Sequence, residues 1–112
     1  MLNNLAWVLG KNKNQNALLY AEKANTLAPN QPNIMDTLAG LLAEKGETTR
    51  AIQLLTRALE IQPSNADIRL NLAKIYIQAG NKSEAKNELK NLAKLGEKSK
   101  NYPEVSSLMK SL

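Results

Sequence analysis

Residues 32–63 read PNIMDTLAGLLAEKGETTRAIQLLTRALEIQP, and this stretch decides the fold. Its apolar residues recur at spacings of three and four, which is typical of helices that bury one face. Gly46 interrupts the pattern where a helix would end in left-handed backbone, and Pro63 lacks the N–H that a continuing helix needs. The stretch therefore predicts two helices, at about 32–45 and 48–61, joined by a tight turn.

The same pattern recurs along the chain at a shift of 34 residues. Leu38 falls on Leu72, and Gly46 falls on Gly80. A fixed period of this length is typical of stacked two-helix units, each of which covers the apolar face of the next. Further helices are therefore expected at about 2–10, 15–28, 65–79, 82–95 and 103–111.

The composition excludes most alternatives to a helical stack. Apolar residues make up 43 % of the 112 residues, but aromatic residues only 4 %, and Phe is absent. Leu and Ala dominate the apolar set, which favours helices over strands. The chain has neither Cys nor His, so thiolate or imidazole metal sites and Ser–His or Cys–His nucleophiles are excluded. No apolar run is long enough to cross a membrane. We expect an all-α protein without enzyme activity, metal or cofactor.

Local signals mark two helix starts and the end of the stack. Ser64, followed three residues later by Asp67, predicts a capping box before the helix at 65–79. Pro103 fits the first turn of the last helix. That helix is expected to cap the exposed face of the third unit, or alternatively to detach and bind a partner. Its apolar stripe consists of Val105, Leu108, Met109 and Leu112.

The net charge of +5 is concentrated in the C-terminal part of the chain. Lysine recurs every fourth residue there, which places the four side chains along one helical stripe. The stripe is either a solvated outer face or a site for an acidic polymer, such as an anionic polysaccharide or a nucleic acid. The small number of arginines and aromatic residues argues against nucleic acid. The stripe consists of Lys82, Lys86, Lys90 and Lys94.

These features resemble the tetratricopeptide-repeat (TPR) family. In the middle unit, the positions of the family pattern are occupied by Met35, Leu38, Ala39, Leu42, Ala51, Leu55, Ala58 and Pro63. The resemblance implies a right-handed α-α superhelix of about seven helices, a TPR solenoid. It implies one domain over 1–112, with repeats at about 1–31, 32–65 and 66–99 and a capping helix at about 103–111.

The resemblance also implies a function. Members of the family are protein–protein interaction scaffolds that bind a peptide segment in the concave groove of the helix stack. The groove positions of the family correspond here to Asn3, Trp7, Asn33, Asp36, Thr37, Gly40, Ala43, Glu44, Asp67, Leu70, Asn71, Lys74, Ile77 and Gln78. For Trp7, Leu70 and Ile77, packing inside the stack is the alternative. The cations with which chaperone-binding members hold a terminal carboxylate are missing at the matching positions, so a clamp of that kind is not expected.

A narrower resemblance concerns the origin of the chain. Residues 2–7 (LNNLAW), 21–24 (AEKA) and the tail from 101 to 112 look like bacterial repeat lipoproteins of exosortase (PEP-CTERM) and exopolysaccharide systems. This resemblance implies an extracytoplasmic scaffold anchored elsewhere in a longer chain; without it, a cytoplasmic location is expected. The first predicted helix has no preceding repeat to cover it. We therefore expect the chain to be the C-terminal piece of a longer array, or to self-associate through that helix.

Overall fold

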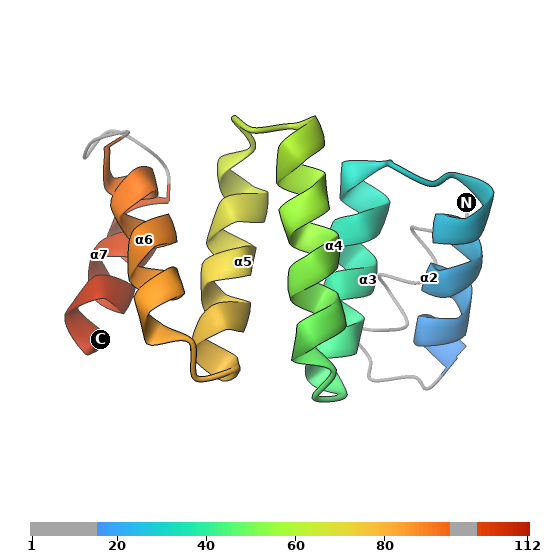
Figure 1. Ribbon diagram of the computed structural model, residues 1–112, viewed down its shortest axis with the longest axis horizontal. Coiled ribbons are helices and arrows are strands. Elements are labelled where there is room, and N and C mark those ends of the chain that lie inside the picture. Colours follow the sequence, from blue (N-terminus) through green and yellow to red (C-terminus); the bar gives the residue numbers. More distant parts are fainter. Residues whose placement is uncertain (1–15, 95–100) are drawn as a thin grey trace.

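The computed structural model describes residues 16–94 and 101–112 of the chain. Within these residues it contains six helices and no strand, so the all-α class is confirmed (Figure 1). The bounds agree with the sequence-based prediction to within two residues. The predicted helix at 2–10 lies outside the described residues. The helices are α2 (Asn16–Leu27), α3 (Pro32–Glu44), α4 (Thr48–Ile61), α5 (Ala66–Gln78), α6 (Lys82–Ala93) and α7 (Tyr102–Ser111).

Left-handed residues end the helices where the sequence predicted them. Gly46 follows α3 with φ of 85°, and Gly80 follows α5 with φ of 84°. Only glycine adopts this conformation without a steric penalty from Cβ. Asn30, with φ of 67°, plays the same part in the turn after α2. The sequence analysis did not anticipate this role, although asparagine is the residue other than glycine that tolerates it best.

The predicted capping box at Ser64 is wrong by one residue. The N-cap of α5 is Asn65, whose side-chain oxygen accepts a hydrogen bond from the backbone N–H of Ile68 at 3.0 Å. Asn65 has the extended backbone that an N-cap requires, with φ of −77° and ψ of 96°. Its side-chain amide also donates to Gln62 at 3.0 Å, which holds it in place.

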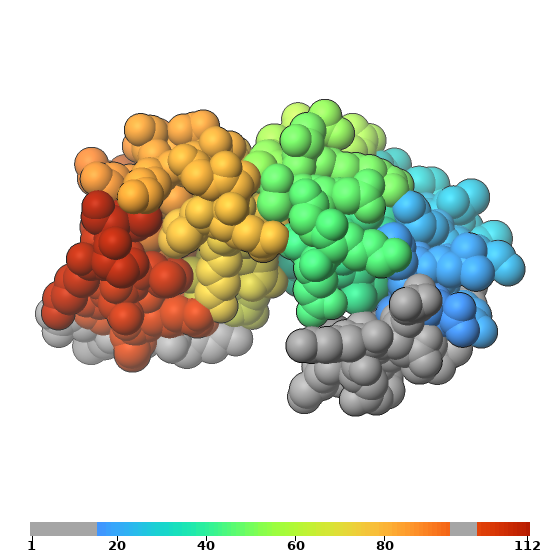
Figure 2. All heavy atoms as spheres, turned by 90° about the horizontal axis from the view of Figure 1, so that it is seen from below, coloured from blue at the N-terminus to red at the C-terminus, as the bar shows by residue number. Residues whose placement is uncertain are grey.

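The helices lie side by side in chain order and form a stack (Figure 1). Within their units α3 packs against α4 and α5 against α6, and each described second helix packs against the first helix of the next unit. A view from below shows α4 and α6 along one long edge of the molecule, with α5 and α7 toward the other (Figure 2). α3 also contacts α5 directly across one repeat. The first helices therefore share one side of the stack.

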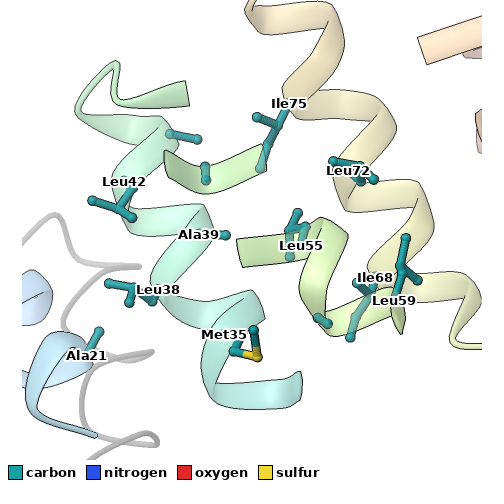
Figure 3. Close-up of a cluster of buried hydrophobic side chains, with 13 residues drawn as sticks. Ala21, Met35, Leu38, Ala39, Leu42, Leu55, Leu59, Ile68, Leu72 and Ile75 are labelled. Carbon is teal, nitrogen blue, oxygen red and sulfur yellow. The ribbon is translucent and has the colours of Figure 1, made fainter. Parts of the chain in front are cut away.

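Small side chains sit where the helices cross. Ala51, Ala58 and Ala85 are completely buried, so the helix backbones can approach closely. Leucines fill the space between these crossings, and Figure 3 shows Leu38 of α3 and Leu55 of α4 in the same cluster. This main core extends from α2 to α5.

A second, smaller core lies at the C-terminal end of the stack. It joins α7 to α5 and α6, and partly buried side chains from the apolar stripe of α7 pack around it. α7 thereby covers the apolar face that the third unit would otherwise expose. The buried members of this second core are Leu70, Ala73, Leu89, Leu92 and Val105.

Candidate binding groove

The side of the stack formed by α3 and α5 is held together by polar side chains. The amide of Asn71 donates to both carboxylate oxygens of Asp36, at 3.0 and 3.2 Å. Seven residues further along α5, the amide of Gln78 donates to the backbone carbonyl of Ala43 at 2.6 Å. These two links fix the spacing between the helices that the sequence predicts as the floor of the groove.

The predicted groove residues of α3 and α5 differ in how much surface they offer. Asn33, Gly40, Glu44, Asp67, Lys74 and Gln78 are exposed, whereas Asp36, Thr37, Asn71 and Ile77 are half-buried. Ala43 and Leu70 are buried, with 5 % and 4 % of their surface exposed. Asn3 and Trp7 lie outside the described residues. The structure therefore brings a mostly polar set of side chains to this side, with Ile77 and the methylene of Gly40 as its apolar surface.

Leu70 belongs to the C-terminal core and not to the surface of the groove. It packs in one cluster with Leu89 and Val105. The sequence left two alternatives for Leu70, a position on the groove surface or packing inside the stack. The structure shows packing inside the stack. The burial comes from α7, whose position the repeat pattern of α5 alone could not indicate.

Gly40 leaves open space on the exposed side of α3. A Cβ atom built at this position would meet no heavy atom within 4 Å, other than those of its own helix. Gly40 lies one helical turn after Asp36 and one turn before Glu44, so it shares their stripe on α3. The two links to α5 thus lie on either side of the open space at Gly40.

α7 extends this polar side to the C-terminal end. The amide of Asn101, just before α7, donates to the Asp67 carboxylate at 3.1 Å. The ammonium group of Lys74 pairs with the Glu104 carboxylate at 2.5 Å, although both side chains remain about half exposed. The sequence analysis missed Asn101 and Glu104. Continuing the 34-residue shift would have found the first, because Asn101 lies 34 residues after Asp67.

The groove is acidic although the whole chain is basic. Asp36, Glu44, Asp67 and Glu104 line it, and Lys74 is the one lysine among its described residues. Burial raises the pKa of Asp36 above its usual value, the hydrogen bond from Asn71 opposes this shift, and the charge of Asp67 adds to it. The carboxylates therefore give this side of α3 and α5 a negative potential.

Neither a metal site nor a membrane-crossing helix is found among the described residues. Within 16–94 and 101–112, no three acidic, His or Cys side chains are placed to hold a metal ion. None of the described helices is long and apolar enough to cross a membrane. What the groove does offer is a set of hydrogen-bond donors and acceptors on α3 and α5.

Several solved structures resemble this chain in shape. The translocator chaperone SycD of type III secretion in Yersinia enterocolitica matches with a TM-score of 0.85 and 17 % identity, over 98 % of this chain and 79 % of SycD. SycD in complex with a peptide of the translocator YopD matches with a TM-score of 0.83 and 18 % identity, over 98 % and 88 %. A tetratricopeptide-repeat protein from Parabacteroides merdae matches with a TM-score of 0.80 and 23 % identity. The match covers 96 % of this chain but only 43 % of the Parabacteroides protein.

Sequence comparison identifies the family. A search of curated proteins found no match. The family model described as tetratricopeptide repeat matches residues 42–112, which is more than half of the chain. Together with the 34-residue period and the left-handed glycines after α3 and α5, this match shows that the chain belongs to the tetratricopeptide-repeat family.

Proposed function

We propose that this chain is a non-catalytic scaffold that binds a peptide segment of another protein in the groove between α3 and α5. The observation that carries the proposal is the open stripe of α3 around Gly40, bracketed by the links from Asn71 and Gln78. The links hold both helices at a fixed spacing before a ligand arrives. A preformed groove spares the ligand the free energy of ordering its site.

The similar solved structures support a peptide as the ligand. One of them is a chaperone in complex with a peptide of its translocator, and its fold superimposes on nearly the whole of this chain. Because the sequence identity is 18 %, this similarity shows a common fold but does not identify the partner of this chain. We infer the class of ligand, a polypeptide segment, from the common fold and from the groove itself.

The groove surface indicates which side chains the bound peptide segment should have. Asp36 and Asp67 disfavour acidic side chains and accept hydrogen bonds from lysine, arginine or backbone N–H groups. A small apolar side chain suits the open space at Gly40, and the half-buried Ile77 offers further apolar surface on α5. The proposed ligand is therefore a segment with one small apolar anchor and basic or neutral flanks.

The experiment fills the open space at Gly40 and leaves the fold intact. Gly40→Arg places a long side chain in the open space, and Gln53→Arg adds the same side chain to the exposed surface of α4 as a matched control. Each variant, carrying an affinity tag, is used to capture partners from extracts of the native cells. We expect proteins that bind the wild type and Gln53→Arg to be lost with Gly40→Arg, while the circular dichroism spectra of all three remain helical. Equal capture by all three variants would contradict binding in this groove.

Three further aspects stay predictions from the sequence. They are the extracytoplasmic location implied by the exosortase-type resemblance, the self-association through residues 2–10, and the binding of an acidic polymer by the lysine stripe. The last is favoured by one observation, that Lys82, Lys86, Lys90 and Lys94 are all exposed. Binding of this kind would weaken steeply with salt, because each phosphate or carboxylate contact releases a counterion.

A further inference from the structure

Within the described residues, α7 packs against one second helix, whereas α3 and α5 each pack between two. α3 lies between α2 and α4, and α5 lies between α4 and α6. α7 occupies the corresponding place after α6, and within the described residues α6 is the one second helix that packs against it (Figure 1). Among the described helices, no second helix follows α7.

A cleft of about 330 Å³ lies between α6 and α7. The side chain of Val105, which is 1 % exposed, forms its floor, and the half-buried Tyr102 and Met109 form apolar walls. The residues that line it are Ala93, Tyr102, Val105, Ser106, Met109 and Lys110. None of them belongs to the groove of α3 and α5, so this end cleft is a separate surface.

The lysine stripe lies on α6, the helix that contributes Ala93 to the end cleft. Ala93 lies three residues after Lys90 and seven after Lys86, so the three side chains share one side of the helix. Lys110 adds a cation from α7. All four lysines of the stripe are exposed, and none of them forms an ion pair with another residue in the described part of the chain. The cleft therefore combines an apolar floor with a cationic border.

We propose that the end cleft docks an amphipathic helix of a partner protein, with an apolar stripe in the cleft and acidic side chains facing the lysine stripe. Such a helix would pack on α7 as α4 packs on α3 and as α6 packs on α5. The second helices already present show which apolar stripe packs against a first helix, because each of them buries residues at positions i, i+4 and i+7. These residues are Ala17, Ala21 and Ala24 in α2, Ala51, Leu55 and Ala58 in α4, and Ala85, Leu89 and Leu92 in α6.

Charge favours a different polypeptide over a second copy of this chain. α3 is the one described helix with a net negative charge, from Asp36 and Glu44, and it is already packed between α2 and α4. The other described helices are neutral or carry one net positive charge. They would bring no surplus of carboxylates to the lysine stripe. A polyanion without apolar groups would leave the floor of the cleft unfilled.

The test uses a synthetic helical peptide as the probe. The peptide carries Ala, Leu and Ala at i, i+4 and i+7 and glutamate on both flanks, and a second peptide has lysine in place of every glutamate. Binding to the full chain is followed by fluorescence anisotropy and by the NMR signals of ¹³C-labelled methionine methyl groups. Met109 lines the cleft, whereas Met35, which is 2 % exposed in the main core, serves as the internal control. We expect the acidic peptide to shift the methyl signal of Met109 and not that of Met35, and the lysine peptide to shift neither.

Two double variants and one single variant distinguish the contribution of the cleft from that of the lysine charges. Lys86→Glu with Lys90→Glu should weaken binding of the acidic peptide at least about tenfold, because charge reversal turns two attractions into repulsions. The matched control, Lys23→Glu with Lys45→Glu, makes the same charge change at exposed positions away from the cleft and should change the affinity less than about twofold. Ser106→Phe fills the cleft and should also abolish the shift of Met109. Circular dichroism verifies that each variant is folded.

Several results would overturn the proposal. The first is an unchanged Met109 signal at saturating acidic peptide. The second is equal binding of heparin and the acidic peptide, with Ser106→Phe affecting neither, which would assign the lysine stripe to polyanions. The third is a dimer in light scattering that Lys86→Glu with Lys90→Glu dissociates, which would make a second copy of the chain the occupant.

Discussion

The middle of the stack and its C-terminal end are built from the same repeat but are closed differently. In the middle, α3 is packed between α2 and α4 and contributes to a cluster of 13 buried side chains. At the end, α7 rests on a smaller cluster around Leu89 and Val105, and the ion pair between Lys74 and Glu104 that ties it to α5 is about half exposed. Because each unit buries its neighbour's apolar face, a helix packed against one second helix should be held less tightly than a helix packed between two. We therefore expect α7 to be less stable than α3.

The largest expected effect comes from removing a side chain in the middle. Leu55→Ala deletes a completely buried leucine between α3 and α5, and it should lower the free energy of unfolding by about 3 kcal/mol. Urea denaturation followed by circular dichroism measures this loss. Leu54→Ala, at a half-buried position of the same helix, is the control and should lose clearly less. Equal losses in the two variants would show that the main core is not centred where the structure places it.

A smaller and more local effect is expected at the end of the stack. Val105→Ala removes two methyl groups from the small cluster under α7 and should cost about 1–2 kcal/mol. The loss should fall mainly on α7, because α7 can separate from α6 while α3 to α5 stay packed. Hydrogen exchange should accelerate in residues 102–111 and remain unchanged in α3. Equal acceleration in both helices would mean that the stack opens as one unit and that its end is no weaker than its middle.

The same comparison shows which features the sequence could predict. The period of 34 residues predicted each described helix to within two residues, because the helix starts and stops are local: proline, glycine and the apolar spacing suffice. The N-cap of α5 was placed at Ser64 instead of Asn65, since both residue types can cap and only the backbone conformation distinguishes them.

Features that depend on contact between units could not be read from the sequence. The hydrogen bond from Gln78 to the Ala43 carbonyl joins two repeats, and no residue pattern reveals a backbone acceptor. The burial of Leu70 depends on where α7 rests, and so does the end cleft beside Met109. The sequence therefore predicts the units and their exposed stripes, whereas the surfaces at the end of the stack require the structure.

Glycine substitutions should distinguish a helix interior from a helix end. Gly40→Ala in the open middle of α3 should raise the free energy of unfolding by about 0.5–1 kcal/mol, because alanine is the better helix former and its Cβ meets no other atom. Gly46→Ala, at φ of 85°, should lower it by about 1 kcal/mol instead, because its Cβ is strained in left-handed backbone. Urea midpoints of the two variants give the signs directly. A lower free energy of unfolding for Gly40→Ala than for the wild type would show that the space beside Gly40 is not open.

The smallest expected effect concerns the link between α3 and α5, and it depends on pH. Because burial raises the pKa of Asp36 in the folded protein, the ionised carboxylate opposes folding. The folded state binds the proton more tightly than the unfolded chain, so this unfavourable contribution is absent below the unfolded pKa. It develops as the pH rises from that value through the folded pKa, and it is complete above. Asp36→Asn keeps an oxygen that can accept from Asn71 but removes the charge, so it should stabilise the protein by no more than about 1 kcal/mol at neutral pH.

The contrast between neutral and acidic pH tests this reasoning. The difference between Asp36→Asn and the wild type should shrink as the pH falls to about 3, where the wild-type carboxyl is protonated as well. Urea denaturation at both pH values measures the difference, and Glu44→Gln, at an exposed position of the same helix, is the control for lost charge. Destabilisation by Asp36→Asn at neutral pH, growing with pH, would mean that the ionised carboxylate strengthens the link to α5. The middle of the stack would then depend on a charged contact, as its C-terminal end does through Lys74 and Glu104.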